Sequence, residues 1–336
     1  KSEAVPGMEV IDASAEHPSD EDAAVESGFS AAGGDAVDPS VEGQGGDADA
    51  PDTLTPQART LHEALRAQRF AVLSEGHALR PYLRFLAGLA EAQHQTQDGL
   101  PEPELPAVDD RVRAKDYGMP PLDRGKFSTD QVLDATLDRL FALSVGIEMP
   151  DPARQALDRA THLDAAARDA MVRNVLSDSI PVEQLGEHVY VAAALQLHFA
   201  RLAARLDPRS LGPVGDGACP CCGGAPVTSM VVGWQGAHNT RFCSCSLCAT
   251  LWHVVRIKCV LCGSTEGISY QEIENGPGSG KVRAETCEKC RCYVKILQQQ
   301  NDPALDPVAD DVATLGLDLL VREDGYRRGA VNPYLM

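Results

Sequence analysis

The chain has 336 residues, 43% of them hydrophobic, which is enough for one large domain or two domains of ordinary size. Its formal net charge of −19 is concentrated in residues 1–54, where fourteen acids and one base give −13 and leave −6 for the rest. No apolar run of about 18 residues is present, so we expect no membrane-spanning helix. No dense block of Lys and Arg is present, so we expect no nucleic-acid partner.

Residues 1–54 form an acidic leader that is rich in Ala, Gly, Asp, Glu, Ser and Pro and has no apolar period. Such a segment buries too little apolar surface to offset its ordering entropy, so we expect it to be disordered. A tail that docks a partner is the alternative. The chain also shows no basic region followed by an apolar core near its start, so we expect no secretory signal and a cytoplasmic location.

Residues 55–208 carry apolar side chains at helical spacing, which predicts an all-α domain. It opens at Thr55 and Pro56, which resemble an N-cap followed by proline at the first helical position. A proline-rich loop is expected over 97–127. Helices are predicted over 57–75, from Pro81, after a capping box at Ser128 and Gln131, and over about 152–177 and 183–206.

After residue 208 the sequence changes to short β-prone runs separated by turn residues. The segment 274–281 is expected to be a hairpin loop between two strands. A final helix follows, with Val308, Val312, Leu315 and Leu319 on one face and Gly325 at its end. Strands are predicted within 226–234, 252–258 and 293–297.

All eleven cysteines lie between Cys219 and Cys292, and eight of them form four CxxC pairs. A tight CxxC turn brings two thiolates to one side, where both reach a cation at about 2.3 Å. Gly223 and Gly263 follow two of the pairs and suit the positive φ that closes such a turn. Ala249 and Arg291 follow the other two, which therefore lack that aid. The predicted metal ligands are Cys219, Cys222, Cys245, Cys248, Cys259, Cys262, Cys287 and Cys290.

The gaps between the pairs indicate how they combine into two four-ligand sites. Long gaps follow Cys222 and Cys262, and each can hold a hairpin that returns the chain to the metal. The short gap from Cys248 to Cys259 suits one strand that leads to the next module. We therefore pair 219/222 with 245/248, and 259/262 with 287/290; an interleaved pairing is the alternative.

The three other thiols, of Cys221, Cys243 and Cys292, are interpreted as small buried or half-buried side chains. Ligand exchange is the alternative, and Cys243 in particular could replace Cys245. Four thiolates suit zinc or iron about equally, and a closed site of this kind leaves no open position for a substrate. We therefore expect no catalytic residues.

Other polar residues near the cysteines receive simpler interpretations. Because the sites already have four thiols each, His253 is interpreted as a packed or surface histidine. Asp310 and Asp311 lie in the first turn of the last predicted helix, where the helix dipole favours negative charge, so they need no functional role. Eight bases lie between 241 and 295, and we interpret them as compensation for the negative charge of the metal sites.

Several segments resemble the formate dehydrogenase accessory protein FdhE family. They include "VAAALQLHFARLAARL", "SLCATLWHVVRIKCVLCGS", "VRAETCEKCRCYVKIL" and the terminal "NPYLM", and the similarity covers roughly residues 57–336. Two positions depart from the family pattern: Cys221 intrudes between the first pair, and Leu251 stands where the family usually shows Glu.

The resemblance implies a cytoplasmic maturation factor that binds the catalytic subunit of a respiratory formate dehydrogenase before export. It also implies rubredoxin-like modules that hold two metal ions, with iron expected and zinc as the alternative. The expected fold is α+β: a disordered leader (1–54), a helical domain (55–208), two tandem rubredoxin-like modules (209–254 and 255–300) and a C-terminal helix and tail (301–336). The rival functions are a rubredoxin-like electron-transfer protein and a zinc-ribbon nucleic-acid-binding protein.

Overall fold

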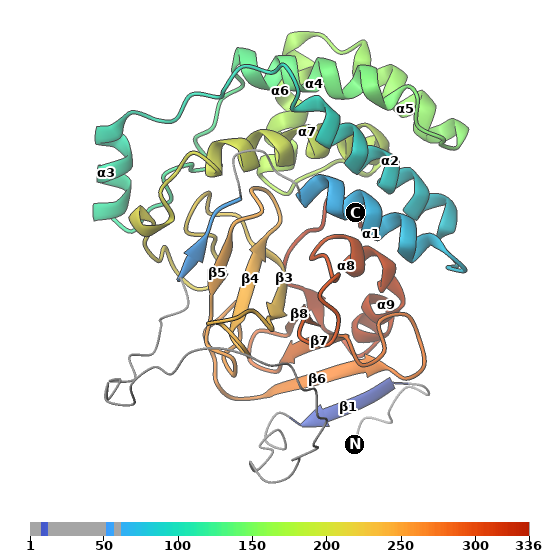
Figure 1. Cartoon of the computed structure of the whole chain (residues 1–336), viewed down its shortest axis with the longest axis vertical. Helices are drawn as coiled ribbons and strands as arrows, with labels where there is room; N and C mark the ends of the chain where they lie inside the picture. The colour runs from blue at the N-terminus through green and yellow to red at the C-terminus, as the bar shows by residue number, and fades with distance from the viewer. Residues whose placement is uncertain (1–7, 13–51, 57–61, 336) are drawn as a thin grey trace, which may run out of the picture.

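The helices of the N-terminal half occupy one end of the protein, and a single mixed β-sheet with two short C-terminal helices occupies the other (Figure 1). The computed structural model describes residues 8–12, 52–56 and 62–335. The fold class is therefore α+β, as predicted. None of the helices in these ranges is both long and apolar enough to cross a membrane.

The helical domain is built around helix α7, which spans Leu185–Ala203. Every residue from Tyr190 to Ala203 is buried, because this segment is largely apolar and other helices pack around it. The short turns η2 (Val182–Gln184) and η3 (Pro208–Ser210) flank it. The other helices are α1 (His62–Ser74), α2 (Arg80–Thr96), α3 (Val108–Asp116), α4 (Gln131–Ser144), α5 (Asp151–Thr161) and α6 (Ala165–Leu176).

Three details of the helical domain differ from the sequence-based expectation. The N-cap of α4 is Asp130, whose carboxylate accepts from the Leu133 N–H at 2.7 Å, so the capping box at Ser128 is wrong. The helix expected over 152–177 is two helices, because Asp164 caps a new start at α6. Helix α3 lies inside the expected loop 97–127; none of its residues is buried, so it has no apolar face that the sequence would show.

The sheet has nine strands among the described residues, in the order β1-β6-β7-β8-β3-β4-β5-β2, with β9 added beside β8. The antiparallel set β3-β4-β5 carries the first two CxxC pairs, and β6-β7-β8 carries the others. The strands are β1 (Met8–Asp12), β2 (Thr53–Leu54), β3 (Pro226–Val231), β4 (Arg241–Cys245), β5 (Leu251–His253), β6 (Ile268–Ile273), β7 (Val282–Cys287), β8 (Cys292–Gln298) and β9 (Arg327–Arg328).

The two expected modules share this sheet, because β3 and β8 pair in parallel with Ser229 opposite Ile296. The expected loop 274–281 does connect β6 to β7. The last helix is divided into α8 (Ala309–Ala313) and α9 (Leu315–Glu323), which lie beside β7 and β8 (Figure 1). Gly325, at φ +83°, follows the end of α9 as expected.

Two parts of the acidic leader differ from the expected disorder. Residues 8–12 form β1, which pairs antiparallel with the edge strand β6, and Thr53–Leu54 form β2 beside β5. The short run "MEVID" has the apolar, β-prone composition that completes a sheet edge. The rest of the leader lies outside the described residues, as do 57–61 at the expected start of the first helix.

The largest hydrophobic core joins the two ends of the protein. It contains side chains of α2, α4 and α7 together with the cysteines of the first two CxxC pairs. A smaller core around Ile268, Tyr270 and Ile296 contains Cys259 and Cys287. The first cysteine group therefore lies at the boundary between helices and sheet, whereas the second belongs to the sheet alone.

Candidate metal centres

The eight cysteines of the CxxC pairs gather into two groups of four, as the gap lengths predicted. Within each group all four sulfurs lie within 4.8 Å of one another. We call the first group site 1 and the second group site 2. Site 1 is Cys219, Cys222, Cys245 and Cys248, and site 2 is Cys259, Cys262, Cys287 and Cys290.

Each CxxC pair sits in a turn closed by a residue with positive φ. The φ angle is +75° at Gly223 and +72° at Gly263, as expected for glycine at this position. Ala249 (+56°) and Arg291 (+52°) adopt the same left-handed conformation in the other two turns. The absence of glycine there therefore does not change the turn, although each such residue costs about 1–2 kcal/mol.

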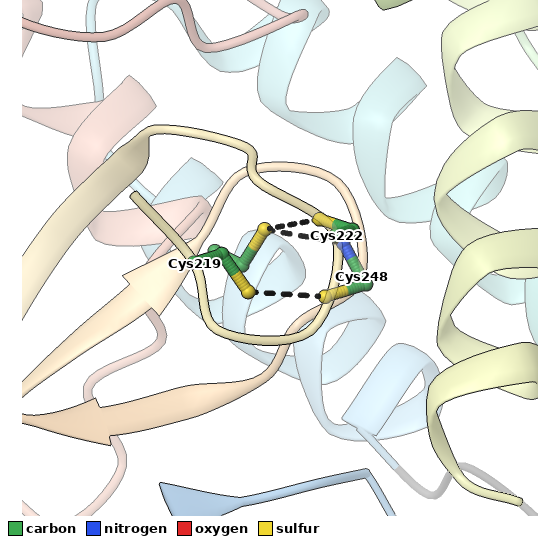
Figure 2. A group of neighbouring side chains, drawn as sticks. Cys219, Cys222 and Cys248 are labelled. Atoms are coloured by element: carbon green, nitrogen blue, oxygen red, sulfur yellow. Dashed lines mark hydrogen bonds between the residues drawn. The ribbon is translucent and has the colours of Figure 1, made fainter. Parts of the chain in front are cut away.

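The sulfur geometry suits a metal ion and not disulfides. The Sγ atoms of Cys219 and Cys248 are 3.6 Å apart, and those of Cys262 and Cys287 are 3.8 Å apart. A tetrahedral ion with metal–sulfur bonds of about 2.3 Å places its sulfurs roughly 3.8 Å apart. A disulfide needs about 2.05 Å. Figure 2 shows the side chains of Cys219, Cys222 and Cys248 directed toward one another.

Backbone N–H groups face the sulfurs in site 1. The N–H groups of Cys221 and Leu247 donate to the sulfurs of Cys219 and Cys245, each at 3.4 Å. Such donors stabilise thiolate charge once the protons have been displaced.

The thiols of site 2 differ from one another: burial opposes ionisation of Cys262, but hydrogen bonds from the Ser264 N–H and from neighbouring thiols lower its pKa. Burial raises the pKa of Cys259 to about 11, although N–H groups of its own turn oppose the change, so this thiol is protonated at neutral pH. Metal binding at neutral pH must therefore release protons.

The two sites differ in burial. All four cysteines of site 1 are buried, with exposures of at most 3%. In site 2, Cys259 and Cys287 are buried but Cys262 and Cys290 are only half-buried. Solvent and a partner can therefore reach the edge of site 2, whereas site 1 is closed.

Site 1 is also bonded to the helical domain. The N–H groups of Leu122 and Arg124 donate to the carbonyls of Cys221 and Cys222 at 3.0 and 3.2 Å. From α7, the Gln196 amide donates to the Ser246 carbonyl at 2.8 Å. These bonds hold both CxxC turns of site 1 against the helical domain. A well-ordered site 1 and the packing of the two domains therefore depend on each other.

The three thiols outside the two groups are small packed side chains, as expected. Cys221 and Cys243 are buried and Cys292 is half-buried. Burial raises the pKa of Cys243 to about 12. Cys245 belongs to site 1 and Cys243 does not, so the alternative that Cys243 replaces Cys245 as a ligand is not the arrangement in the structure. His253 is exposed and belongs to neither site.

Most bases around the cysteines neutralise carboxylates, which corrects the expectation that they compensate the charge of the metal sites. Arg241 is fully buried and pairs with Glu285 at 2.7 Å. Five other bases of this region also have carboxylate partners: Lys258, Lys281, Arg283, Arg291 and Lys295.

Sequence reasoning missed a buried ionic network behind β8. Asp311 is fully buried, 3.2 Å from Lys295 Nζ, and it also pairs with Arg328. Lys295 Nζ lies 2.5 Å from Asp318, which accepts the Tyr293 hydroxyl at 2.7 Å. The helix-dipole explanation of Asp311 was therefore incomplete. The signal available was a lysine inside a β-prone run, "YVKIL", where a buried partner is needed.

Fold and sites together define a protein that joins a helical domain to a sheet domain with two four-cysteine centres, each able to bind a metal ion. Family models match consecutive parts of the chain. They are described as "FdhE, N-terminal" over residues 50–216, "FdhE, central domain" over 218–256 and "FdhE, C-terminal domain" over 257–335.

Relatives agree with these matches. A "Protein FdhE homolog" of Rhizobium meliloti is 46% identical over 89% of this chain and 97% of its own. One from Enterobacter sp. is 34% identical over 85% of this chain and 91% of its own. The crystal structure of the FdhE protein from Pseudomonas aeruginosa has a TM-score of 0.74 and 30% identity, covering 85% of this chain and 99% of that one. The chain therefore belongs to the FdhE family.

Proposed function

We propose that this chain is an accessory protein that binds the catalytic subunit of a respiratory formate dehydrogenase in the cytoplasm and supports its assembly before export. Membership of the FdhE family carries the proposal, because the sequence resembles formate dehydrogenase accessory proteins. The site geometry is consistent with a role that is not enzymatic. Four thiols complete a tetrahedral shell, which leaves no position for a substrate.

We further propose that both sites hold metal and that the metal is iron. The ligands would be the four cysteines of site 1 and the four of site 2. An ion bound there would supply structural cross-linking and, if it is iron, a one-electron redox couple. The chain's own contribution is to hold the four sulfurs at tetrahedral spacing and to direct backbone N–H groups at them.

In this account site 1 acts by fixing the domains relative to each other. The bonds from Leu122, Arg124 and Gln196 join its CxxC turns to the helical domain, so a rigid site 1 gives a rigid arrangement of both domains. A partner that contacts helices and sheet together then meets a preformed surface, which lowers the entropy cost of binding.

The test is capture of the purified catalytic subunit by the immobilised full chain, with metal analysis of the same sample. We expect the native protein to retain the subunit and to contain two metals per chain, one for each cysteine group. The C219A/C222A variant should lose one metal and most of its capture. C292A, which removes a half-buried thiol outside both groups, is the matched control and should keep both. Full capture by a variant that has lost its metal would contradict the proposal.

A second candidate function, electron transfer, is supported by the exposure of site 2. Cys262 and Cys290 are half-buried, so an electron donor or acceptor can approach their sulfurs closely. A reversible potential that changes when the catalytic subunit is added would favour this function. Zinc in the native protein would exclude it, because zinc has no redox couple.

Nucleic-acid binding is not proposed. The bases of the sheet domain are largely engaged in ion pairs, such as Arg241 with Glu285 and Lys258 with Asp216. They therefore do not present the unmatched basic face that phosphate binding needs.

A further inference from the structure

A cavity of about 770 Å³ lies where the helical domain meets the C-terminal end of the chain. One wall comes from Ile180 and Val182, between α6 and α7, and from Leu185 at the start of α7. The opposite wall comes from α9 and the residues that follow it, among them Arg322 and Arg327. Boundaries between domains are a preferred place for binding sites. None of the eight ligand cysteines lines this cavity, so it is distinct from both sites.

The floor of the cavity is electrically balanced. It is formed by Tyr293, Asp318 and Arg328, which belong to the buried ionic network. Lys295 and Arg328 supply two cations to this network, and Asp311 and Asp318 supply two anions. Because these charges neutralise one another, the floor itself attracts neither sign of ligand strongly.

The wall of the cavity is not balanced. Its other acid, Asp178, pairs with Arg124. Arg322 and Arg327, by contrast, are exposed. Within residues 62–335, no side chain or carbonyl accepts a hydrogen bond from either guanidinium, and no carboxylate forms an ion pair with it. Two positive charges therefore remain available beside the cavity. Arginine presents a planar fork that matches a carboxylate with two parallel hydrogen bonds.

The same cavity has an apolar wall that is open to solvent. Val182 is 76% exposed and Val331 is 39% exposed, and the partly buried Ile180, Leu185 and Leu335 continue the surface. A small inorganic anion would contact the arginines but leave these side chains in water. A peptide that carries both carboxylates and apolar side chains would cover both parts.

We propose that this cavity docks an acidic, partly apolar peptide segment on the catalytic subunit that the chain binds. The inference rests on the proposed function and identifies the surface that carries it out. Carboxylates of the segment pair with Arg322 and Arg327, and its apolar side chains cover Val182 and Val331. Charge complementarity selects the segment, and the apolar wall contributes affinity.

The test compares binding of the purified catalytic subunit to the full metal-loaded chain and to R322E/R327E, by biolayer interferometry at low and physiological salt. The double variant should bind about ten-fold or more weakly, and its affinity should depend less on salt. V182D, which places a carboxylate in the apolar wall, should also weaken binding. All three residues are exposed, and melting temperature and metal content of each variant verify the fold.

The matched control is R80E/R139E, which makes the same change of charge at two exposed arginines on α2 and α4, away from the cavity. It should bind like the native chain. Equal weakening of both double variants, or unchanged binding by R322E/R327E, would overturn the docking site while leaving the proposed function intact. Failure of the native chain to bind would overturn both. Displacement of the subunit by millimolar phosphate, but not by chloride of equal ionic strength, would assign the cavity to a small anion and overturn the peptide.

Discussion

Loss of the metal at site 1 is expected to destabilise the protein more than loss of the metal at site 2. The comparison is between C219A/C222A and C259A/C262A, each of which removes two of four ligands from one site. Both variants lose the binding energy of one ion. Only the first also loosens the CxxC turns that are bonded to the helical domain.

The difference can be worked out from the contacts. Three hydrogen bonds join site 1 to the helical domain, from the N–H groups of Leu122 and Arg124 in the loop between α3 and α4 and from the side chain of Gln196 in α7. At about 1 kcal/mol net each, their loss amounts to about 3 kcal/mol. For a chain of 336 residues, that corresponds to a further drop in melting temperature of roughly 4–5 °C.

The assay is thermal unfolding followed by circular dichroism, with metal content measured on the same samples. We expect each variant to retain one ion and C219A/C222A to melt at the lower temperature. C292A should match the native protein in both measurements. If C259A/C262A lost as much stability as C219A/C222A, the assignment of site 1 as the connection between domains would be wrong.

The remaining predictions concern the ionic network and one turn. K295M should destabilise the fold by roughly 3–5 kcal/mol in urea unfolding, because it leaves two buried carboxylates with one cation; an unchanged midpoint would contradict the network. Burial opposes ionisation of Asp311, but Arg328 and Lys295 dominate and hold its pKa below the ordinary 3.8. The stabilising effect of the ionised carboxylate is therefore present above that value and is lost as the pH falls below it. The free energy of unfolding of D311N should consequently decrease less steeply with falling pH than that of the native protein. A249G should raise stability by about 1 kcal/mol, since Ala249 has a φ of +56°; destabilisation would show that its methyl group contributes packing.

The metal-site geometry was the part of the structure that the sequence predicted best. A CxxC pair constrains its own turn, and the gap lengths decide which turns can meet, so the pairing of Cys219/Cys222 with Cys245/Cys248 follows from local information. Helix α7 was predictable for a similar reason, because a long apolar segment at helical spacing is bound to be buried.

The loop 274–281 was expected to join two strands, but the bounds of β6 and β7 were not predicted, and β4 was not predicted at all, because the burial of these strands depends on partners far away in the sequence. From the sequence, Arg241 in β4 is expected to be a surface residue, because its burial depends on the ion pair with Glu285 of β7. Gln271 in β6 and Thr286 in β7 are likewise buried polar residues that interrupt an apolar alternation. The joining of both modules through the parallel pair β3 and β8 is also a long-range contact, which no local pattern reveals.

The central claim is that two metal ions, each held by four thiolates, order the C-terminal half of this chain. Native mass spectrometry of protein purified without chelators tests it most directly. The account predicts a chain that carries two ions, iron in each, with C219A/C222A and C259A/C262A carrying one. A metal-free chain that keeps its melting temperature, or a mass that shows the cysteines joined as disulfides, would contradict it.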